Sequence, residues 1–223
     1  VLGGGPIGSE LAQAFARLGS TVSLVQRGER ILHKEDPEVS ELARQALVRD
    51  GVQVLTGHAA LRCERDGERK LLVVAHAGEE KTIEFDQLLV AVGRKARLTG
   101  YGLEELGIPT SKTVATNDYL ETLYAAVNAL FGQFKRFKVD YSVIPWTTFI
   151  DPEVARVGLS EEEARERGIA FEVTRFELAE LDRAIADSAT SGFVKVLTVP
   201  GRDRILGVTL VGTQGGDLLA EFV

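Results

Sequence analysis

Sulfur-containing residues are almost missing from this chain, which has one cysteine and no methionine among 223 residues. A single thiol, Cys63, excludes an internal disulfide and a cysteine-rich metal site, and makes a reducing, cytoplasmic setting the default expectation. Because Cys63 falls inside a predicted strand, we expect a buried structural thiol. The three histidines have no metal-ligand spacing.

Long apolar runs and an excess of positive charge are also missing. The longest apolar candidates, such as residues 88–92, have the length of a buried strand and fall short of the roughly 20 residues that cross a bilayer. A formal net charge of −7 and a pI near 5.2 argue against a general binder of nucleic acid or anionic membrane. No signal peptide is recognisable. With 44% apolar and 26% charged residues, the composition is that of an ordinary globular protein of one or two domains.

The first 55 residues alternate between strand and helix patterns. Apolar spacing and turn residues predict strands at 1–2, 21–25 and 52–55, and helices at 7–18 and 38–50. Asp36-Pro37 supplies a helix cap followed by proline at the first helical position. The order β-α-β-α-β predicts a parallel sheet with right-handed crossovers, in an α/β Rossmann-type domain.

Short alternating segments follow. Turns at 66–67 and 77–78 predict an antiparallel β meander of strands 60–64, 71–76 and 81–85, followed by an apolar strand over 86–92 and a short helix around 103–106. From residue 141 the pattern predicts an α+β unit with Trp146 in its core or interface. Its expected elements are strands 143–150, 171–176, 192–199 and 204–211, a helix opened by the capping box Ser160…Glu163, and a helix over 218–223.

A glycine-rich turn, Gly3-Gly4-Gly5-Pro6-Ile7-Gly8, joins the first strand to the first helix. The spacing Gly3-x-Gly5-x-x-Gly8 places glycine where a nucleotide-binding turn must bend tightly, admit a pyrophosphate and pack helix against strand. The pyrophosphate would lie at the positive end of the helix dipole, beside free N–H groups. In a chain with 23 glycines the spacing alone is as typical of a plain turn. The order strand, turn, helix, strand favours a dinucleotide site that includes Pro6 and Ile7.

The end of the second strand distinguishes between the two nicotinamide cofactors. An acidic residue there would bond the ribose hydroxyls of NAD, whereas this chain has Gln26 and Arg27, with Glu29 nearby and further basic residues at Arg30, His33 and Lys34. In an acidic protein this cluster favours NADP over NAD, although a solvated loop of mixed charge is the alternative. Ala59, after the third strand, is also assigned to the cofactor site. Glu10 either stabilises the first helical turn or points toward the nicotinamide end.

These motifs resemble those of the pyridine nucleotide-disulfide oxidoreductase family, which includes mercuric reductase, dihydrolipoamide dehydrogenase and glutathione reductase. The resemblance covers almost the whole chain. It rests on residues 1–11, on 89–94, where the family's glycine (here Gly93) lies against the cofactor, and on 102–108, 145–159, 192–196 and 205–208. It implies an NAD(P)-binding domain over 1–123, a remnant of the FAD-domain return segment over 124–140, and a truncated dimerisation domain over 141–223. Gln26-Arg27 is more similar to the NADPH-using, mercuric-reductase-like branch.

Several parts of the family pattern are absent from the sequence. The resemblance implies an N-terminal FAD domain with a redox CxxxxC pair, a flavin-binding Gly-Asp motif after residues 116–122, and a C-terminal His-Pro-Thr element; none is found. Together with the missing methionine, this predicts a fragment of a larger enzyme.

The fragment is expected to bind NADPH or NADH as the hydride donor of a FAD enzyme, to form homodimers, and to be inactive alone. A dimerisation scaffold with a vestigial pocket and a dihydrolipoamide dehydrogenase-like NAD enzyme are the alternatives. A flavin-independent Rossmann dehydrogenase ranks last, because no catalytic residue for it is found.

Overall fold

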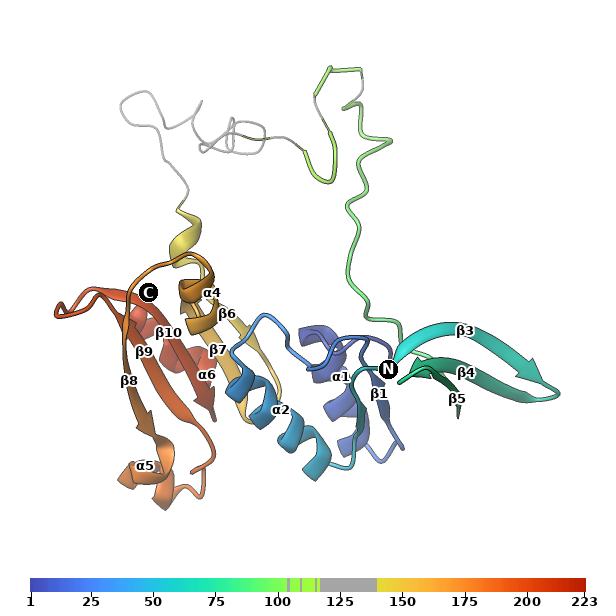
Figure 1. The fold of residues 1–223 in the computed structure, drawn as a ribbon, viewed down its shortest axis with the longest axis horizontal. Coiled ribbons are helices and arrows are strands. Elements are labelled where there is room, and N and C mark those ends of the chain that lie inside the picture. The colour runs from blue at the N-terminus through green and yellow to red at the C-terminus, as the bar shows by residue number, and fades with distance from the viewer. Residues whose placement is uncertain (104, 109, 115, 117–139) are drawn as a thin grey trace. The chain divides into compact units, whose positions relative to one another are not determined.

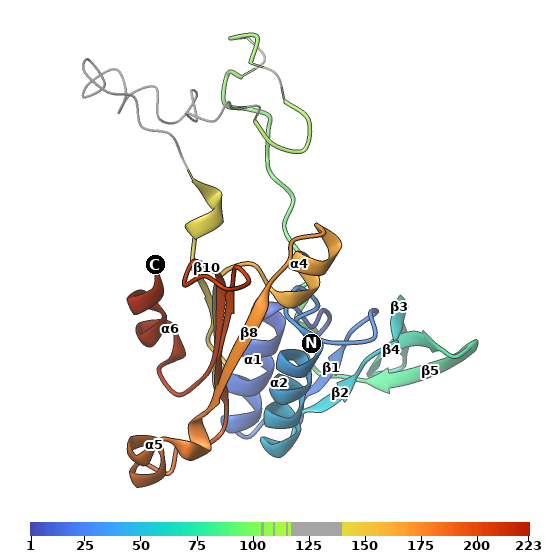
Figure 2. The same ribbon diagram turned by 60° about the vertical axis from the view of Figure 1, so that its left-hand side comes forward.

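The structure is a computed structural model that describes residues 1–103, 105–108, 110–114, 116 and 140–223. Its contacts define two compact units, one formed by Val1–Val92 with Ser142–Val223 and the other by Gly93–Tyr141. The first unit is drawn as ribbons in Figures 1 and 2 and contains nearly all of the helices and strands. The predicted boundary at 123 and nearly all of the predicted remnant 124–140 lie outside the described residues.

The N-terminal part has the predicted α/β order. Helix α1 (Pro6–Arg17) is followed by β1 (Ser23–Val25), α2 (Pro37–Arg49) and β2 (Gln53–Leu55), and β1 pairs with β2 in parallel. Leu2 forms parallel bridges to Val25 on one side and Val90 on the other. The predicted strands 1–2 and 86–92 are therefore present as bridges rather than full strands. Between 103 and 107, the described residues form turns instead of the predicted short helix.

The meander consists of β3 (Ala59–Asp66), β4 (Arg69–His76) and β5 (Glu79–Glu84), paired antiparallel in that order. Leu72 and Val74 of β4 pack with Val25 in a small core. The expectation of a buried Cys63 is wrong, because the thiol is exposed. Cys63 lies on β3, an edge strand exposed from residue 60 to 66 in a sheet that projects from the body (Figure 1).

The C-terminal part is α+β, as predicted. Its antiparallel sheet has the order β6-β7-β10-β9-β8, formed by β6 (Trp146–Thr148), β7 (Glu153–Gly158), β8 (Glu172–Glu177), β9 (Phe193–Thr198) and β10 (Ile205–Gly212). The predicted strand 143–150 is limited to β6, with a 3-10 turn η1 (Tyr141–Val143) before it, and β7 was not predicted. The terminal helix is broken into α6 (Gly215–Leu218) and η3 (Leu219–Phe222).

Three further short elements complete the second part. Helix α4 (Glu161–Glu166) begins with the predicted capping box, in which the Ser160 side chain accepts from Glu163 N and the Glu163 side chain accepts from Ser160 N. The turn η2 (Leu178–Glu180) and the helix α5 (Asp182–Ala186), neither of them predicted, follow β8.

One hydrophobic core joins the two parts. Helices α1 and α2 lie between the β1–β2 sheet and the five-stranded sheet (Figure 2). Buried residues from both sides meet there, among them Ala12, Leu24 and Leu47 from the first part and Val154 and Phe193 from the second. The helices are therefore covered on two sides, which fixes the glycine turn at the start of α1.

Candidate dinucleotide site

The three motif glycines are each required for a different structural reason. Gly3 has φ +105°, and a Cβ there would lie 2.5 Å from the carbonyl oxygen of Ala91. A Cβ on Gly8 would lie 1.8 Å from Gly3 O, so the helix could not approach the strand so closely. Among the described residues, no atom lies within 4 Å of the Cβ position of Gly5. The first and third glycines thus serve the fold, whereas the second borders open space that a ligand can enter.

The start of α1 faces this open space with unpaired donors. Gly5 is the N-cap and Pro6 occupies the first helical position, so the early N–H groups of Ile7 and Gly8 have no partner in a preceding turn. The first turn contains no acidic residue. Free N–H groups and the positive helix end together make a site suited to an anion.

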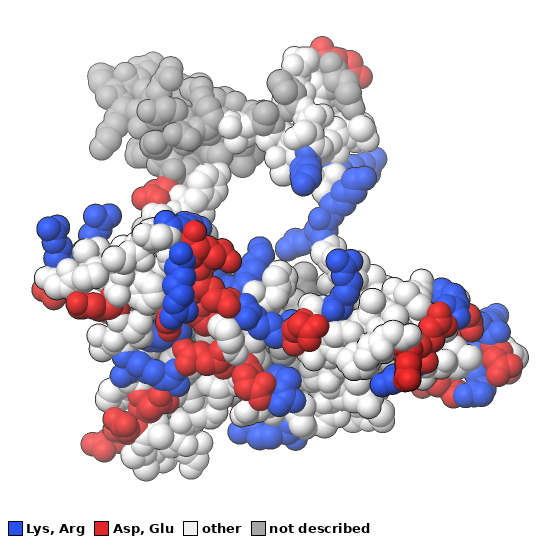
Figure 3. All heavy atoms as spheres, in the orientation of Figure 1, with Lys and Arg blue, Asp and Glu red and all other residues white. Residues whose placement is uncertain are grey.

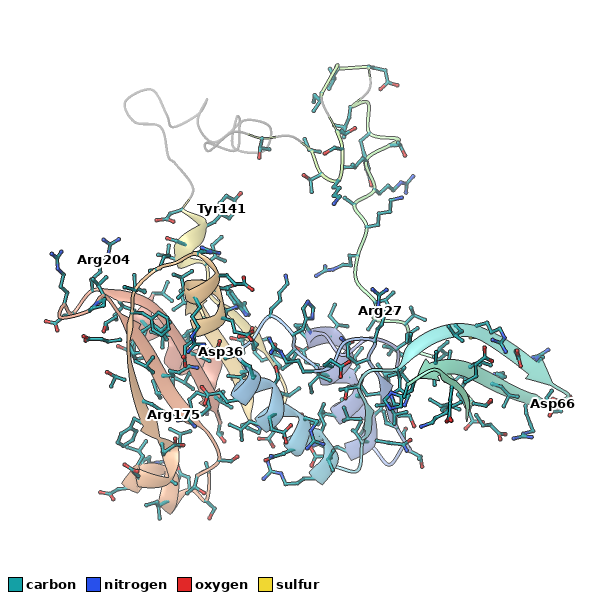
Figure 4. The ribbon with its side chains drawn as sticks, in the orientation of Figure 1. Arg27, Asp36, Asp66, Tyr141, Arg175 and Arg204 are labelled. Carbon is teal, nitrogen blue, oxygen red and sulfur yellow. The ribbon has the colours of Figure 1, made fainter. Side chains whose placement is uncertain are left out.

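The loop after β1 closes over the turn. Gly4 N donates to Gln26 Oε1 at 2.9 Å, and Gly4 O accepts from Leu32 N at 2.7 Å. Gln26 therefore lies at the strand end where it was predicted, but its side chain supports the turn. Arg27, labelled in Figure 4, is exposed and has no ion-pair partner among the residues that the structure describes. Arg27 is free to bind an anion at the rim.

Arg30, assigned to the cofactor site from the sequence, forms an ion pair in this structure. Its Nη1 lies 3.1 Å from Glu162 Oε1, its Nη2 contacts Glu162 Oε2, and it also donates to His33 O at 3.3 Å. Glu162 belongs to α4 in the second part. The basic cluster expected from sequence is therefore divided, with Arg27 free and Arg30 engaged.

Ala59, assigned to the cofactor site from the sequence, is the first residue of β3. The preceding residues bond the loop after β1, since Gly57 N donates to Gly28 O at 2.9 Å and His58 N donates to Gln26 O at 3.0 Å. Gly93 has φ +115° and belongs to the unit Gly93–Tyr141, and its place against the cofactor stays a prediction.

Glu10 lies beyond the first turn of α1, so the interpretation that it stabilises that turn is wrong. Its Oε1 accepts from Phe149 N at 2.9 Å, which connects α1 to the segment after β6. Both residues line a cavity of about 590 Å³, together with Gln13 and Arg17 of α1 and with Asp151. Phe149 is 68% exposed, so the cavity combines an aromatic ring with carboxylates.

A buried ionic network, not foreseen from sequence, attaches the loop after β1 to the second part. Lys195 Nζ donates to Asp36 Oδ2 at 2.6 Å, Glu38 Oε1 at 2.5 Å and Glu161 Oε1 at 2.9 Å, and its side chain is 1% exposed. These three carboxylates are close enough together to hold a metal ion, but here the ammonium of Lys195 occupies the space between them. The cluster is therefore a structural network of ion pairs.

The titration behaviour of this cluster follows from its contacts. Burial alone would lower the pKa of Lys195, but the hydrogen bonds to Asp36, Glu38 and Glu161 outweigh it and raise that pKa above its usual value. Burial alone would likewise raise the pKa of Asp36, and the bonds from Lys195 and the α4 backbone lower it instead. Both groups are thus held in their charged forms.

A second buried pair lies beside the first. Arg156 Nε is 2.9 Å from Glu35 Oε2, and Arg156 Nη1 is 2.6 Å from Glu163 Oε2. The guanidinium lies 4.2 Å from the ring centroid of Trp146, whose Nε1 donates to Glu35 Oε1 at 2.9 Å. Glu35 and Asp36, which are adjacent in sequence, therefore both form buried ion pairs with residues of the second part.

Basic and acidic side chains alternate on the face drawn in Figure 3. Among the described residues, none of the helices is both long and apolar enough to span a membrane. The described residues thus combine a glycine turn at the end of a parallel sheet with an antiparallel meander and an antiparallel α+β part.

Comparison with known families identifies the class of protein. The model of the pyridine nucleotide-disulphide oxidoreductase family matches residues 1–130, and the model of that family's dimerisation domain matches residues 144–223. The chain belongs to this family of flavoprotein oxidoreductases. Its C-terminal α+β part is the dimerisation domain.

Individual relatives agree with this assignment. The chain is 36% identical to a mercuric reductase of Lysinibacillus sphaericus, over 98% of this chain and 45% of the relative. It is 34% identical to a dihydrolipoyl dehydrogenase of Staphylococcus aureus, over 99% of this chain and 52% of that protein. The HOCl-induced flavoprotein disulfide reductase RclA of Escherichia coli has the same fold, with a TM-score of 0.85 and 24% identity over 99% of this chain and 56% of that chain. The chain spans about half the length of the curated relatives it matches.

Proposed function

We propose that this chain is the nicotinamide-dinucleotide-binding and dimerisation part of a mercuric-reductase-like FAD enzyme, and that it binds NADPH in preference to NADH. The observation that carries the proposal is the glycine turn, in which Gly3 and Gly8 are sterically required while Gly5 borders open space at a helix N-terminus. In the whole enzyme, FAD would accept the hydride that the nicotinamide delivers.

Each end of the cofactor has a proposed set of contacts. The N–H groups at the start of α1 would bind the pyrophosphate, and Gly5 would allow its close approach. Arg27 would bind a ribose 2′-phosphate, with Ala59 at the adenosine side. Glu10 and Phe149, which line one cavity, would border the nicotinamide end.

The preference for NADPH rests on charge at the end of β1. Arg27 is exposed and unpaired within the described residues, while Gln26 replaces the carboxylate that would bond the hydroxyls of NAD. A guanidinium matches the planar, bidentate geometry of phosphate. The nearest acid in sequence, Glu29, is exposed and lies beyond Gly28.

Titration of NADPH and NADH against the Arg27→Gln variant tests this assignment. Loss of one charge-assisted bond, ~1.5–3 kcal/mol, should weaken NADPH binding about tenfold or more and leave NADH binding unchanged. Arg49→Gln is the matched control, because Arg49 is exposed at the end of α2 and has no ion pair among the described residues. Equal weakening of both cofactors, or none, would contradict the NADPH assignment.

The Gly5→Ala variant tests the pyrophosphate site separately. Because nothing lies within 4 Å of the Cβ position and φ is −78°, alanine should leave the melting temperature within about 2 °C and abolish binding of both cofactors. Undiminished binding by a folded Gly5→Ala protein would refute the site.

A dimerisation scaffold is the second candidate. It is favoured by Gln26 and Arg30, whose polar groups already bond Gly4 and Glu162.

We further propose a cytoplasmic homodimer formed through the dimerisation domain, with no disulfide reduction by the isolated chain. Absence of saturable binding of either cofactor would support the scaffold. A yellow, flavin-loaded preparation that reduces a disulfide with NADPH would contradict the proposed inactivity.

A further inference from the structure

The two arginines of the loop after β1 have opposite environments. Arg27 is exposed and unpaired among the described residues, whereas both terminal nitrogens of Arg30 contact the carboxylate of Glu162. The side chains of Arg30 and Glu162 are 33% and 36% exposed, so the pair lies at the surface in partial contact with water. The guanidinium of Arg27 is therefore available to a ligand, whereas that of Arg30, three residues later, is paired with a carboxylate.

The backbone of Arg30 is close to the proposed cofactor site. The next residue, Ile31, packs over the glycine turn, with its Cγ2 2.7 Å from the position of a Cβ on Gly4. Leu32 N bonds Gly4 O at 2.7 Å. An arginine side chain leaving this point can therefore turn either toward the glycine turn or toward α4.

Helix α4 is held where it can capture Arg30. Asp36 Oδ1 accepts from Glu162 N at 3.1 Å, and Asp36 Oδ2 accepts from Glu161 N at 3.2 Å. The first turn of α4 is thus fixed to the end of the same loop that contains Arg30. These backbone bonds hold Glu162 in place, so its carboxylate has a defined position beside Arg30.

We propose that Glu162 is a specificity-determining positioning residue, which withholds Arg30 from the ribose phosphate and so limits the preference for NADPH over NADH. This inference rests on the proposed dinucleotide site and adds that its selectivity is set from the dimerisation domain. Arg27 alone supplies the free guanidinium in the native chain. Removing the carboxylate leaves a second guanidinium free to turn toward the 2′-phosphate, with a binding energy that decreases as salt screens it.

The test uses adenosine 2′,5′-bisphosphate and adenosine 5′-phosphate, which differ only in the 2′-phosphate. Glu162→Gln keeps the backbone bond to Asp36 and removes the charge. A partly exposed ion pair is worth up to about 1 kcal/mol, so its release should tighten binding of the bisphosphate about fivefold. Binding of the monophosphate should change by less than about twofold.

The matched control is Glu166→Gln, the same charge change on the same helix. Glu166 is exposed and has no ion pair within the described residues, so this variant should bind both ligands as the native chain does. The Arg30→Gln/Glu162→Gln double variant should return the bisphosphate affinity to the native value. Thermal melting of every variant checks that the fold is retained.

The outcomes separate this inference from the proposed function. If Glu162→Gln and Glu166→Gln bind the bisphosphate equally, or if the double variant keeps the gain, Glu162 does not control Arg30 and the inference is wrong. If the native chain and all variants bind neither nucleotide, the dinucleotide site itself is refuted, and this inference with it.

Discussion

Replacing Lys195 with methionine should strongly weaken the junction between the two parts of the chain. The ammonium is 1% exposed and bonds Asp36, Glu38 and Glu161 at 2.6, 2.5 and 2.9 Å. Methionine has a similar length, so the variant removes the charge while leaving little empty space. Three carboxylates, of which Asp36 is 3% exposed, then face one another without a cation.

The expected cost follows from the loss of one partner of a buried ion pair. Such losses destabilise proteins by about 3–5 kcal/mol, because an uncompensated charge stays buried. Domains of this size are stable by about 5–15 kcal/mol, so the variant should lose a large part of its free energy of unfolding. Neutralising the most buried carboxylate as well, in Lys195→Met/Asp36→Asn, should recover part of this loss.

Urea denaturation followed by tryptophan fluorescence measures this effect. Trp146 is the only tryptophan of the chain and lies at the junction, where it bonds Glu35. Lys81→Met is the control, since Lys81 is exposed on β5 without an ion pair in the described part of the chain. A loss below about 1 kcal/mol for Lys195→Met, similar to that of the control, would show that the cluster is not a buried, coupled network.

Three further results are expected. Gly8→Ala should destabilise the chain by about 1–3 kcal/mol or more and abolish dinucleotide binding, because its Cβ would overlap Gly3 O; a native-like melting curve would contradict this. The stability difference between the native chain and Asp36→Asn should be largest near pH 6 and shrink in acid. The folded pKa of Asp36 is lowered, so its contribution is complete above an unfolded pKa of about 3.9 and is lost as pH falls through the folded value; a pH-independent difference would refute the assignment. Glu35→Ala should shift the Trp146 emission to longer wavelength as the ring loses its partner, and an unchanged spectrum would argue against this contact.

Local patterns in the sequence predicted much of the N-terminal part. The glycine spacing, the proline after Asp36 and the capping box of Ser160 and Glu163 act over a few residues, so their geometry follows from local sterics and hydrogen bonding. The parallel order of β1 and β2 also followed, because strand–helix–strand connections have a strong handedness.

The features that the sequence did not predict are contacts that depend on the completed fold. Cys63 has the neighbours of a strand residue, but whether a strand is covered depends on the elements packed against it, and β3 is an exposed edge. Glu10 is spaced correctly for a nucleotide site, yet its partner Phe149 is 139 residues away. Arg30 was assigned to the cofactor from charge alone, and that assignment stays a prediction. Its ion pair with Glu162, 132 residues further along the chain, was not predicted.

The sequence by itself determined the family, the α/β and α+β classes of the two parts, and the glycine turn suited to a dinucleotide. Only the tertiary structure decided which charges remain available at that turn. Lys195 and Asp36 are 159 residues apart, and no periodic pattern predicts such a pairing. It arises because burial of a charge is tolerated only where the fold brings an opposite charge to it. The fold likewise brings Glu162 to Arg30 at the surface and leaves Arg27 without an ion pair among the described residues.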